Sequence, residues 1–393
     1  MKNSSILYTT LLIFLATFSM GKAENLDATA KQILMGSSDY KLEDYSLETL
    51  IKSQKTESNL PDPSINGEYL FAPEKEDNRW AADISWELEW PGVYGARAAQ
   101  AKKRIESARV NLRMQRADKL AEIKAQLIDY IFVILKLEVI DELNRNNDSI
   151  YTLSQKAAEQ REISVLDLNK VRLEYANIRG VQAALMVEKE TLETSLSEIY
   201  GTDCSHLLAS LEKKFPEIEI PSASEINELK ENAYSVAMAR SEAEVMRQGK
   251  RVASMEALPN VSVGYKHAYE EDTHFNGALL GISIPIFSSR GKQQAAKAAI
   301  TEAEFKVDAA MLSVESQVNK QIKKLSLLKS QIDEIESVLM HADHNAHLLS
   351  AYEHGLISMI DYLTERNYFT TATMEFLSLR REAALTQVML KRY

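Results

Sequence analysis

The sequence predicts a mainly α-helical fold with a smaller β-barrel part, in which long antiparallel helices join four β-strands. Three observations predict it. Two stretches, 96–179 and 292–354, contain neither Gly nor Pro and are rich in residues that favour helix. Four short segments alternate between apolar and polar residues, as strands with two different faces do. Both patterns occur twice in the same order, which indicates a tandem duplication rather than a short solenoid repeat.

The residues that match between the two halves fall in two sets. The first set lies near the predicted strands, where Leu60-Pro61-Asp62-Pro63-Ser64-Ile65 recurs about 198 residues later as Leu258-Pro259-Asn260-Val261-Ser262-Val263. In the second set, Glu159, Ile163, Ser164, Asp167 and Arg172 recur as Glu353, Ile357, Ser358, Asp361 and Arg366. We therefore expect two repeats, about 24–205 and 222–393, that lie side by side in one pseudo-symmetric unit.

The N-terminus has the pattern of a secretory signal peptide, residues 1–23. Lys2 supplies a positive start, residues 6–18 are apolar, and Gly21-Lys22-Ala23 is a small-x-small cleavage site. A membrane-spanning helix is the less favoured interpretation, because it needs about 20 apolar residues. We expect cleavage after Ala23 and export of the remaining chain.

Charge and cysteine content limit the function classes. The 393-residue chain has a net charge of −11, and loss of Lys2 and Lys22 with the signal peptide makes it more negative. This charge argues against nucleic acid as a partner. Cys204 is the single cysteine, so no internal disulfide can form and packing must supply the stability.

The first half begins with helix over residues 28–58, weakened at 36–38 and ended by Pro61 and Pro63. Alternation then predicts strands at 64–71 and 81–90, separated by a charged loop. Pro91-Gly92 ends the second strand. Helix follows from residue 96 to about residue 200, interrupted by a turn-like patch at 161–164, and a linker covers 201–222.

The second half repeats this order. It predicts a helix at 224–257, a strand at 260–269, a polar loop at 270–276, a strand at 277–286, a helix at 292–354, a break at Gly355 and a last helix. Apolar residues at helical spacing form coiled-coil-like seams that indicate packing between long helices. These residues are Ile123, Leu127, Tyr130, Ile134, Leu137 and Val139, and Val314, Val318, Ile322, Leu325, Ile332, Ile335 and Leu339.

The four strands have the length and alternation of tilted membrane-spanning strands. An ordinary half-buried sheet is the alternative interpretation. The membrane interpretation is favoured because Trp86, Trp90, Tyr265 and Tyr269 would suit a lipid-facing aromatic girdle at the interfaces, and because no further strands complete a globular sheet. Four strands cannot close a membrane barrel, for which about eight are the minimum, so several chains must pool their strands.

These parts resemble the TolC-type outer membrane efflux proteins. The stretch from Leu60 to Pro63 and the sequence Ile84-Ser85-Trp86-Glu87-Leu88-Glu89-Trp90-Pro91-Gly92-Val93-Tyr94-Gly95-Ala96-Arg97 are similar to the CusC and CzcC branch, which is linked to heavy-metal efflux. The sequence from Tyr352 to Leu363 resembles the periplasmic turn of the family. The resemblance covers essentially the whole mature chain and rests on the order of the parts.

The resemblance implies a homotrimer with a twelve-stranded barrel in the outer membrane and a tunnel of twelve helices in the periplasm. It also implies a periplasmic adaptor and an inner-membrane pump of the resistance-nodulation-division (RND) type. The chain would then be a passive export duct. A type I secretion channel that works with an ABC exporter is an alternative, and so is an exported coiled-coil structural or adhesive protein, which would leave the strands unexplained.

Two helical turns are the expected docking sites for the adaptor, because only these tips lie far from the membrane. The residues concerned are Arg161, Glu162, Ile163 and Ser164 in the first turn, and Gly355, Leu356, Ile357 and Ser358 in the second. Gly355 permits a turn with positive φ. The first turn has Arg161 or Glu162 there, so we expect it to be built differently. A simple connection between helices is the alternative.

Asp167 and Asp361 follow the two turns. In some members of the family that the chain resembles, an acid at the position of Asp361 narrows the periplasmic entrance. Three-fold symmetry would turn it into an anionic ring that favours cations. Thr364 stands where some channels carry a second acid, so a double ring is not expected. Helix capping is the alternative role for both carboxylates.

His341, His344 and His347 are spaced three residues apart, so the three side chains cannot all point the same way on a helix. Scattered surface histidines are the favoured interpretation, and no metal site is predicted. The sequence carries no nucleophile elbow, phosphate-binding loop, dinucleotide fingerprint or zinc-enzyme spacing. We therefore expect no enzymatic activity and no cofactor.

Overall fold

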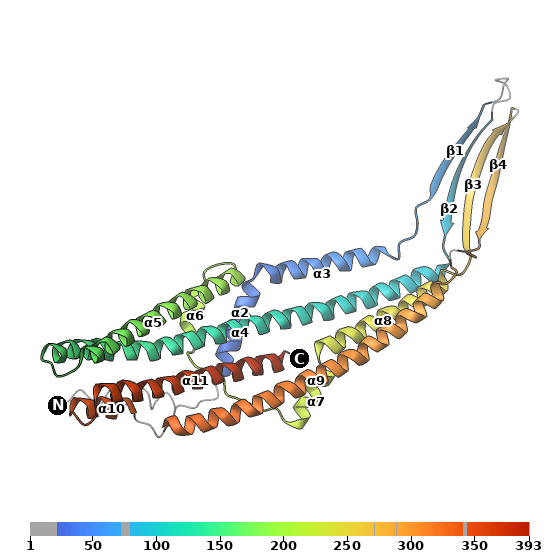
Figure 1. Cartoon of the computed structure of the whole chain (residues 1–393). Coiled ribbons are helices and arrows are strands. Elements are labelled where there is room, and N and C mark those ends of the chain that lie inside the picture. Colours follow the sequence, from blue (N-terminus) through green and yellow to red (C-terminus); the bar gives the residue numbers. More distant parts are fainter. Residues whose placement is uncertain (1–21, 72–78, 271, 288, 341–343, 393) are drawn as a thin grey trace. The chain divides into compact units, whose positions relative to one another are not determined.

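The structure is a computed structural model that describes residues 22–71, 79–270, 272–287, 289–340 and 344–392 (Figure 1). The predicted signal peptide lies almost wholly outside the described residues. The chain divides into two compact units. Unit 1 comprises Met1–Lys41, Arg116–Leu229 and Gln317–Tyr393, and unit 2 comprises Leu42–Gln115 and Lys230–Ser316.

Helices make up most of the described chain, as the sequence predicts. The longest have 69, 49, 36 and 33 residues. In chain order the helices are α2 (Lys22–Gly36), α3 (Ser38–Thr56), α4 (Pro91–Glu159), α5 (Val165–Tyr200), α6 (Ser205–Ser210), α7 (Ala223–Glu231), α8 (Tyr234–Met255), α9 (Lys292–Met340), α10 (His344–Glu353) and α11 (Met359–Lys391). The helix expected over 292–354 is thus α9 and α10, and residues 341–343 lie outside the described chain.

The predicted break at 36–38 separates α2 from α3. Gly36 lies against the ring of Tyr200, and a Cβ atom there would be 2.2 Å from a ring carbon. The Ser37 hydroxyl accepts a hydrogen bond from the Asp39 amide at 3.2 Å and so helps α3 to start. A side chain at position 36 would therefore force Tyr200 to move.

The four strands form one antiparallel sheet in the order β1-β2-β3-β4, within unit 2 (Figure 1). The strands are β1 (Ser64–Leu70), β2 (Arg79–Leu88), β3 (Asn260–Glu270) and β4 (Thr273–Ser283). The pairing of β2 with β3 joins the two predicted hairpins into one sheet. The two halves of the sequence therefore contribute equally to this sheet.

Six of the eight strand ends differ from the prediction, by one to four residues, and two of these differences have a clear physical reason. The polar residues expected to form a loop at 270–276 are mostly strand, because ladder pairs such as Tyr269↔His274 reach the hairpin turn. Asp272, just before β4, adopts a left-handed φ of 56° that Asp tolerates. The strand β2 ends at Leu88, and Pro91 is the first residue of α4, a position that tolerates a residue without an N–H group.

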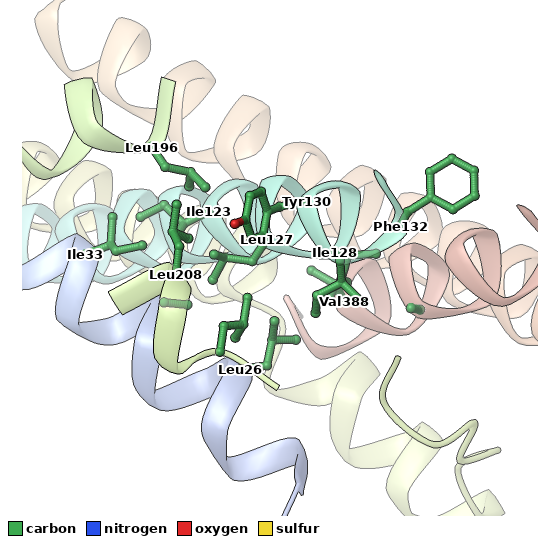
Figure 2. Packing of buried hydrophobic residues seen from close by; sticks show 14 of the residues in the cluster. Leu26, Ile33, Ile123, Leu127, Ile128, Tyr130, Phe132, Leu196, Leu208 and Val388 are labelled. Atoms are coloured by element: carbon green, nitrogen blue, oxygen red, sulfur yellow. The ribbon is translucent and has the colours of Figure 1, made fainter. Parts of the chain in front are cut away.

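The largest hydrophobic cluster lies in unit 1, where α2, α5, α6 and α11 pack against α4 (Figure 2). The predicted seam residues of α4 that are buried there or next to it are Ile123, Leu127, Tyr130, Ile134 and Leu137. In α9 the buried seam residues are Val314, Val318, Leu325 and Ile332. Cys204 joins the large cluster, and burial raises the pKa of its thiol, which keeps it in the unreactive protonated form.

Candidate functional site

The sheet of unit 2 has one apolar and one polar face. Directly paired residues of antiparallel strands point to the same side, so Ile65, Ile84, Tyr265 and Ala278 form one row across all four strands. The same face carries Tyr69, Trp80, Ala82, Trp86, Leu88, Val261, Val263, Tyr269, Leu280 and Ile282, and near the hairpin turn it also carries the polar side chains of His267, His274 and Asn276. The opposite face of β1, β2 and β3 carries Ser64, Asn66, Glu68, Asp83, Ser85, Glu87, Ser262 and Lys266, and β4 adds Phe275 and Leu279 to it.

The apolar face is exposed, as most of the opposite face is too. Ile65 is 79% exposed and Leu280 is 83% exposed, and along β3 the exposed Val261 and Val263 alternate with less exposed small polar residues. A sheet that contributes to a globular core buries its apolar face instead. A contiguous exposed apolar patch of this kind marks a surface that meets a membrane or another protein.

The two outer strands leave the sheet open. β1 and β4 are its edges, and the outer side of each carries backbone N–H and C=O groups that another strand can pair with. A long, apolar, open edge is a template for strand addition. The sheet is therefore suited to extension by strands from other chains.

Three of the four predicted girdle residues lie on the apolar face. Trp86 and Tyr265 lie in the body of β2 and β3, and Tyr269 lies beside the hairpin turn. The prediction that Trp90 belongs to this strand face is wrong, because β2 ends at Leu88 and Trp90 lies in the connection to α4. Pro91 starts the helix directly after it, so the strand cannot continue to Trp90.

Two further aromatic residues of this face, Tyr69 and Trp80, were not among the predicted girdle residues. The ring of Trp80 stacks on Tyr269, with centroids 6.2 Å apart, and Tyr69 lies in the paired position on β1. The sequence did contain a signal for Trp80. It precedes Ala82 by two residues, so the alternation of the predicted strand could have been continued toward the N-terminus to include it. The hairpin end of the apolar face is therefore richer in aromatic residues than predicted.

Ion pairs tie the sheet to the helices that continue its strands. Arg97 of α4 pairs with Glu89, which follows β2, and with Glu256, which follows α8, at 2.8 and 2.9 Å. Lys292 at the start of α9 also pairs with Glu256, at 3.2 Å. These contacts link the C-terminal end of α8 to the N-terminal ends of α4 and α9, next to the sheet.

The two helical turns of unit 1 have the same construction. The amides of Glu162 and Leu356 donate to the carbonyls of Ala157 and Ala351, each at 2.8 Å, in the bond that closes a Schellman helix end. The residues before them, Arg161 and Gly355, both have positive φ, of 62° and 71°. The expectation that the first turn is built differently is therefore wrong, because Arg161 adopts the conformation that a glycine provides at the second turn.

The two aspartates after the turns are helix caps. The Ser164 and Ser358 hydroxyls each accept from the amide of the aspartate three residues on, at 3.1 Å, and donate to its carboxylate at 2.7 Å. At Ser358 the backbone amide also donates to Asp361, which completes a capping box. The bond from Ser164, helped by Lys170, lowers the pKa of Asp167. The capping alternative thus describes what both carboxylates do within one chain.

The two turns also pack together and expose aliphatic side chains. A buried cluster joins Ile150 and Val171 of the first helix pair to Met359, Tyr362 and Leu363 of the second. The large aliphatic side chains that remain exposed beside the turns are Val165, Leu166 and Leu356. The sequence prediction of docking residues did not include Val165 and Leu166, although they lie next to Ser164.

Arg161→Gly should stabilise unit 1, because a left-handed conformation costs a residue with a Cβ atom about 1 kcal/mol more than glycine. Gly355→Ala should destabilise it by about the same amount. Chemical unfolding of the detergent-solubilised protein, followed by circular dichroism, measures both. Gly180→Ala, in the interior of α5, is the control of opposite sign to Gly355→Ala: a Cβ atom there meets open space and φ is not positive, so it should stabilise by about 0.5–1 kcal/mol. A destabilising effect of Arg161→Gly would contradict the equivalence of the two turns.

The three-histidine pattern yields no metal cluster. His341 lies outside the described residues, His344 begins α10, and His347 is exposed on that helix. Among the residues that the structure describes, no group of three or more His, Cys, Asp or Glu side chains is placed to hold a metal ion. Within the same part of the chain, every helix is too short or too polar to cross a membrane.

No protein-family model matches the sequence. No curated protein matches it either. Solved structures do match over nearly the whole length. A membrane protein from Pseudomonas aeruginosa is 14% identical with a TM-score of 0.78, and the match covers 94% of this chain and 90% of that one.

Two further solved structures that match are an outer membrane protein and a protein that forms a transmembrane channel. The outer membrane protein VceC from Vibrio cholerae is 14% identical with a TM-score of 0.73, and the match covers 93% of this chain and 94% of that one. CusC, which forms a transmembrane channel, is 13% identical with a TM-score of 0.69, over 95% and 94% of the two chains. The chain therefore has the fold of outer membrane channels, and the lower score of CusC means that the fold does not single out its branch.

Proposed function

We propose that this chain is the outer membrane channel of a tripartite efflux system, a passive duct through which a pump exports its cargo. The observation that carries the proposal is the four-stranded sheet whose apolar face is exposed and whose two edges are open. In this proposal the apolar face, with its aromatic residues, contacts the outer membrane lipid. The polar face, with Asp83, Glu87 and Lys266, lines the water-filled interior.

Closure of the barrel requires other copies of the chain. An open sheet edge is not tolerated in the hydrocarbon of a membrane, because each unpaired backbone group there costs several kcal/mol. Four strands are too few to close a barrel, for which about eight are the minimum. Three copies would supply twelve strands, with β4 of each chain beside β1 of the next. The fold shared with outer membrane channels supports this trimer.

The helices would continue the duct into the periplasm as a tunnel. The two turns would then receive a periplasmic adaptor, and exposed Val165, Leu166 and Leu356 offer it an apolar contact. The adaptor would connect the duct to an inner-membrane pump of the RND type. Metal cations are the cargo that the resemblance of residues 84–97 favours, and the acidic charge of the chain is compatible with them.

The assembly can be tested by fractionating cells and measuring the mass of the detergent-solubilised protein. We expect an outer membrane species with the mass of three chains, each 44.3 kDa before any cleavage. Heating should dissociate it to single chains. A protein that fractionates as soluble, or that is a monomer in mild detergent, would exclude the shared barrel and with it the export duct.

Asp361 is also proposed to narrow the periplasmic entrance, in addition to capping α11. Three copies of this exposed carboxylate would form an anionic ring in a trimer. Asp361→Ala should then raise single-channel conductance and reduce cation preference in planar bilayers. Ser358→Ala is the control, because it removes the cap hydroxyl and keeps the charge. Equal conductance and selectivity in Asp361→Ala and the parent would reject the ring.

A further inference from the structure

We propose that His267 and His274 form a binding site for a divalent transition-metal ion near the hairpin turn of β3 and β4. The register pairs His267 with Asn276 and His274 with Tyr269, so the two histidines are diagonal neighbours on the apolar face, at its hairpin end. Nε2 of His267 and Nδ1 of His274 lie 3.2 Å apart. The site lies within one hairpin, so this inference goes beyond the proposed function and does not rest on it.

The separation of the two nitrogens fits ligands of one metal ion. Imidazole nitrogens bind zinc at about 2.0–2.1 Å, and a tetrahedral angle then places two of them about 3.3 Å apart. The observed 3.2 Å is close to this value, and it is also a hydrogen-bond distance, so an ion would replace the bond from Nδ1 of His274 to Nε2 of His267 and leave the hydrogen of His274 on its other nitrogen. The pair can therefore accept an ion without a large movement of either strand.

Asn276 holds His267 in the tautomer that a metal needs. Its side-chain oxygen accepts a hydrogen bond from the Tyr265 hydroxyl and lies 2.7 Å from Nδ1 of His267. Because that oxygen cannot donate, Nδ1 of His267 carries the hydrogen, and Nε2 presents its lone pair to His274. Metal-binding histidines characteristically donate their second nitrogen to such an oxygen, which fixes the ring.

Aromatic rings hold both imidazoles in place. The ring of His267 lies 5.3 Å from Trp80 and 5.2 Å from His274, measured between centroids, and His274 lies 5.0 Å from Tyr269. Such packing reduces the side-chain entropy that is lost when an ion binds. Neutral imidazoles favour Cu²⁺, Ni²⁺ and Zn²⁺ over the oxygen-seeking Mg²⁺ and Ca²⁺, and Cu²⁺ should bind most tightly of the three.

Cu²⁺ titration of the full-length mature protein, prepared without a histidine tag, tests the site. We expect one tight site per chain, quenching of fluorescence from the adjacent Trp80, and an electron paramagnetic resonance spectrum with coupling to two nitrogens. His267→Gln and His274→Gln should each weaken binding at least about tenfold. Asn276→Ala should weaken it about tenfold as a positioning residue while the two-nitrogen coupling persists.

The matched control replaces the other histidine group, His341, His344 and His347, with glutamine. This triple variant should keep the tight site. Loss of tight binding in the triple variant, or unchanged binding in both His267→Gln and His274→Gln, would overturn the proposal. A parent spectrum without nitrogen coupling would overturn it as well, whether or not any variant folds. The mass in detergent shows separately whether each variant assembles, so failure of this site and failure of the duct are distinguishable.

Discussion

Ile84→Lys should prevent the channel from assembling in the outer membrane. Ile84 lies in the middle row of the apolar face, between Ile65 and Tyr265. A lysine on the lipid-facing side of a membrane barrel costs about 2–4 kcal/mol near the middle of the bilayer. In the proposed trimer each of the three chains would carry this cost, so we expect a large loss of heat-resistant oligomer. Gel migration of unheated outer membrane fractions measures the assembled proportion.

Ser85→Lys is the matched control, because Ser85 is the next residue on the same strand and points to the polar face. In the proposed barrel this lysine meets water, so the variant should assemble close to the parent level. The control loses the contact between the hydroxyls of Ser85 and Ser64, at 2.9 Å, which is a small change at an exposed site. Total expression of both variants should be compared before assembly is scored.

Comparison of Ile84→Lys with Ser85→Lys distinguishes an apolar face that contacts lipid from one that faces water. In a single chain in water, Ile84 is 47% exposed, and a surface substitution of this kind changes stability by about 0.5 kcal/mol or less. If the apolar face met water, Ile84→Lys would therefore be harmless or would improve solubility. Equal assembly of Ile84→Lys and Ser85→Lys would contradict a lipid-facing role of this face.

The strands could be predicted from the sequence because their signal is local. Alternation at a period of two, as in residues 81–90, needs no knowledge of distant residues. The pairing of β2 with β3 could not be predicted in this way, since it joins residues such as Ile84 and Tyr265 that are far apart in the chain. The polar start of β4 was predicted as loop because polar residues at a hairpin end resemble turn residues until their ladder partners are known.

For the helical turns, too, the sequence located the elements but did not predict their conformation. The matching residues around Ser164 and Ser358 correctly located both turns and both caps. The conformation of the first turn was predicted wrongly because a positive φ is expected at glycine, and Arg161 has it through the backbone bonds that close the helix. Equivalent sequence positions can also differ in environment, as Arg172 and Arg366 do.

Arg366→Met should destabilise unit 1 by about 3 kcal/mol. The side chain of Arg366 is only 2% exposed, and its guanidinium donates to Asn147 of α4 at 2.7 Å and to Glu174 of α5 at 3.2 Å. Removal of one partner from a buried ion pair costs about 3–5 kcal/mol, because the other charge stays buried without its partner. The lower value is expected because Glu174 retains some contact with solvent. Chemical unfolding of the detergent-solubilised protein measures the change.

Arg172→Met is the matched control, because Arg172 is the repeat equivalent of Arg366 and is exposed on α5. It should change the free energy of unfolding by about 0.5 kcal/mol or less. In the double variant Arg366→Met/Glu174→Leu, the uncompensated carboxylate is gone, so part of the lost stability should return. Comparison with the two single variants should then give a favourable interaction energy between Arg366 and Glu174. Equal stabilities of Arg366→Met and Arg172→Met would show that the buried pair between α11 and α5 does not hold the two helix pairs of unit 1 together.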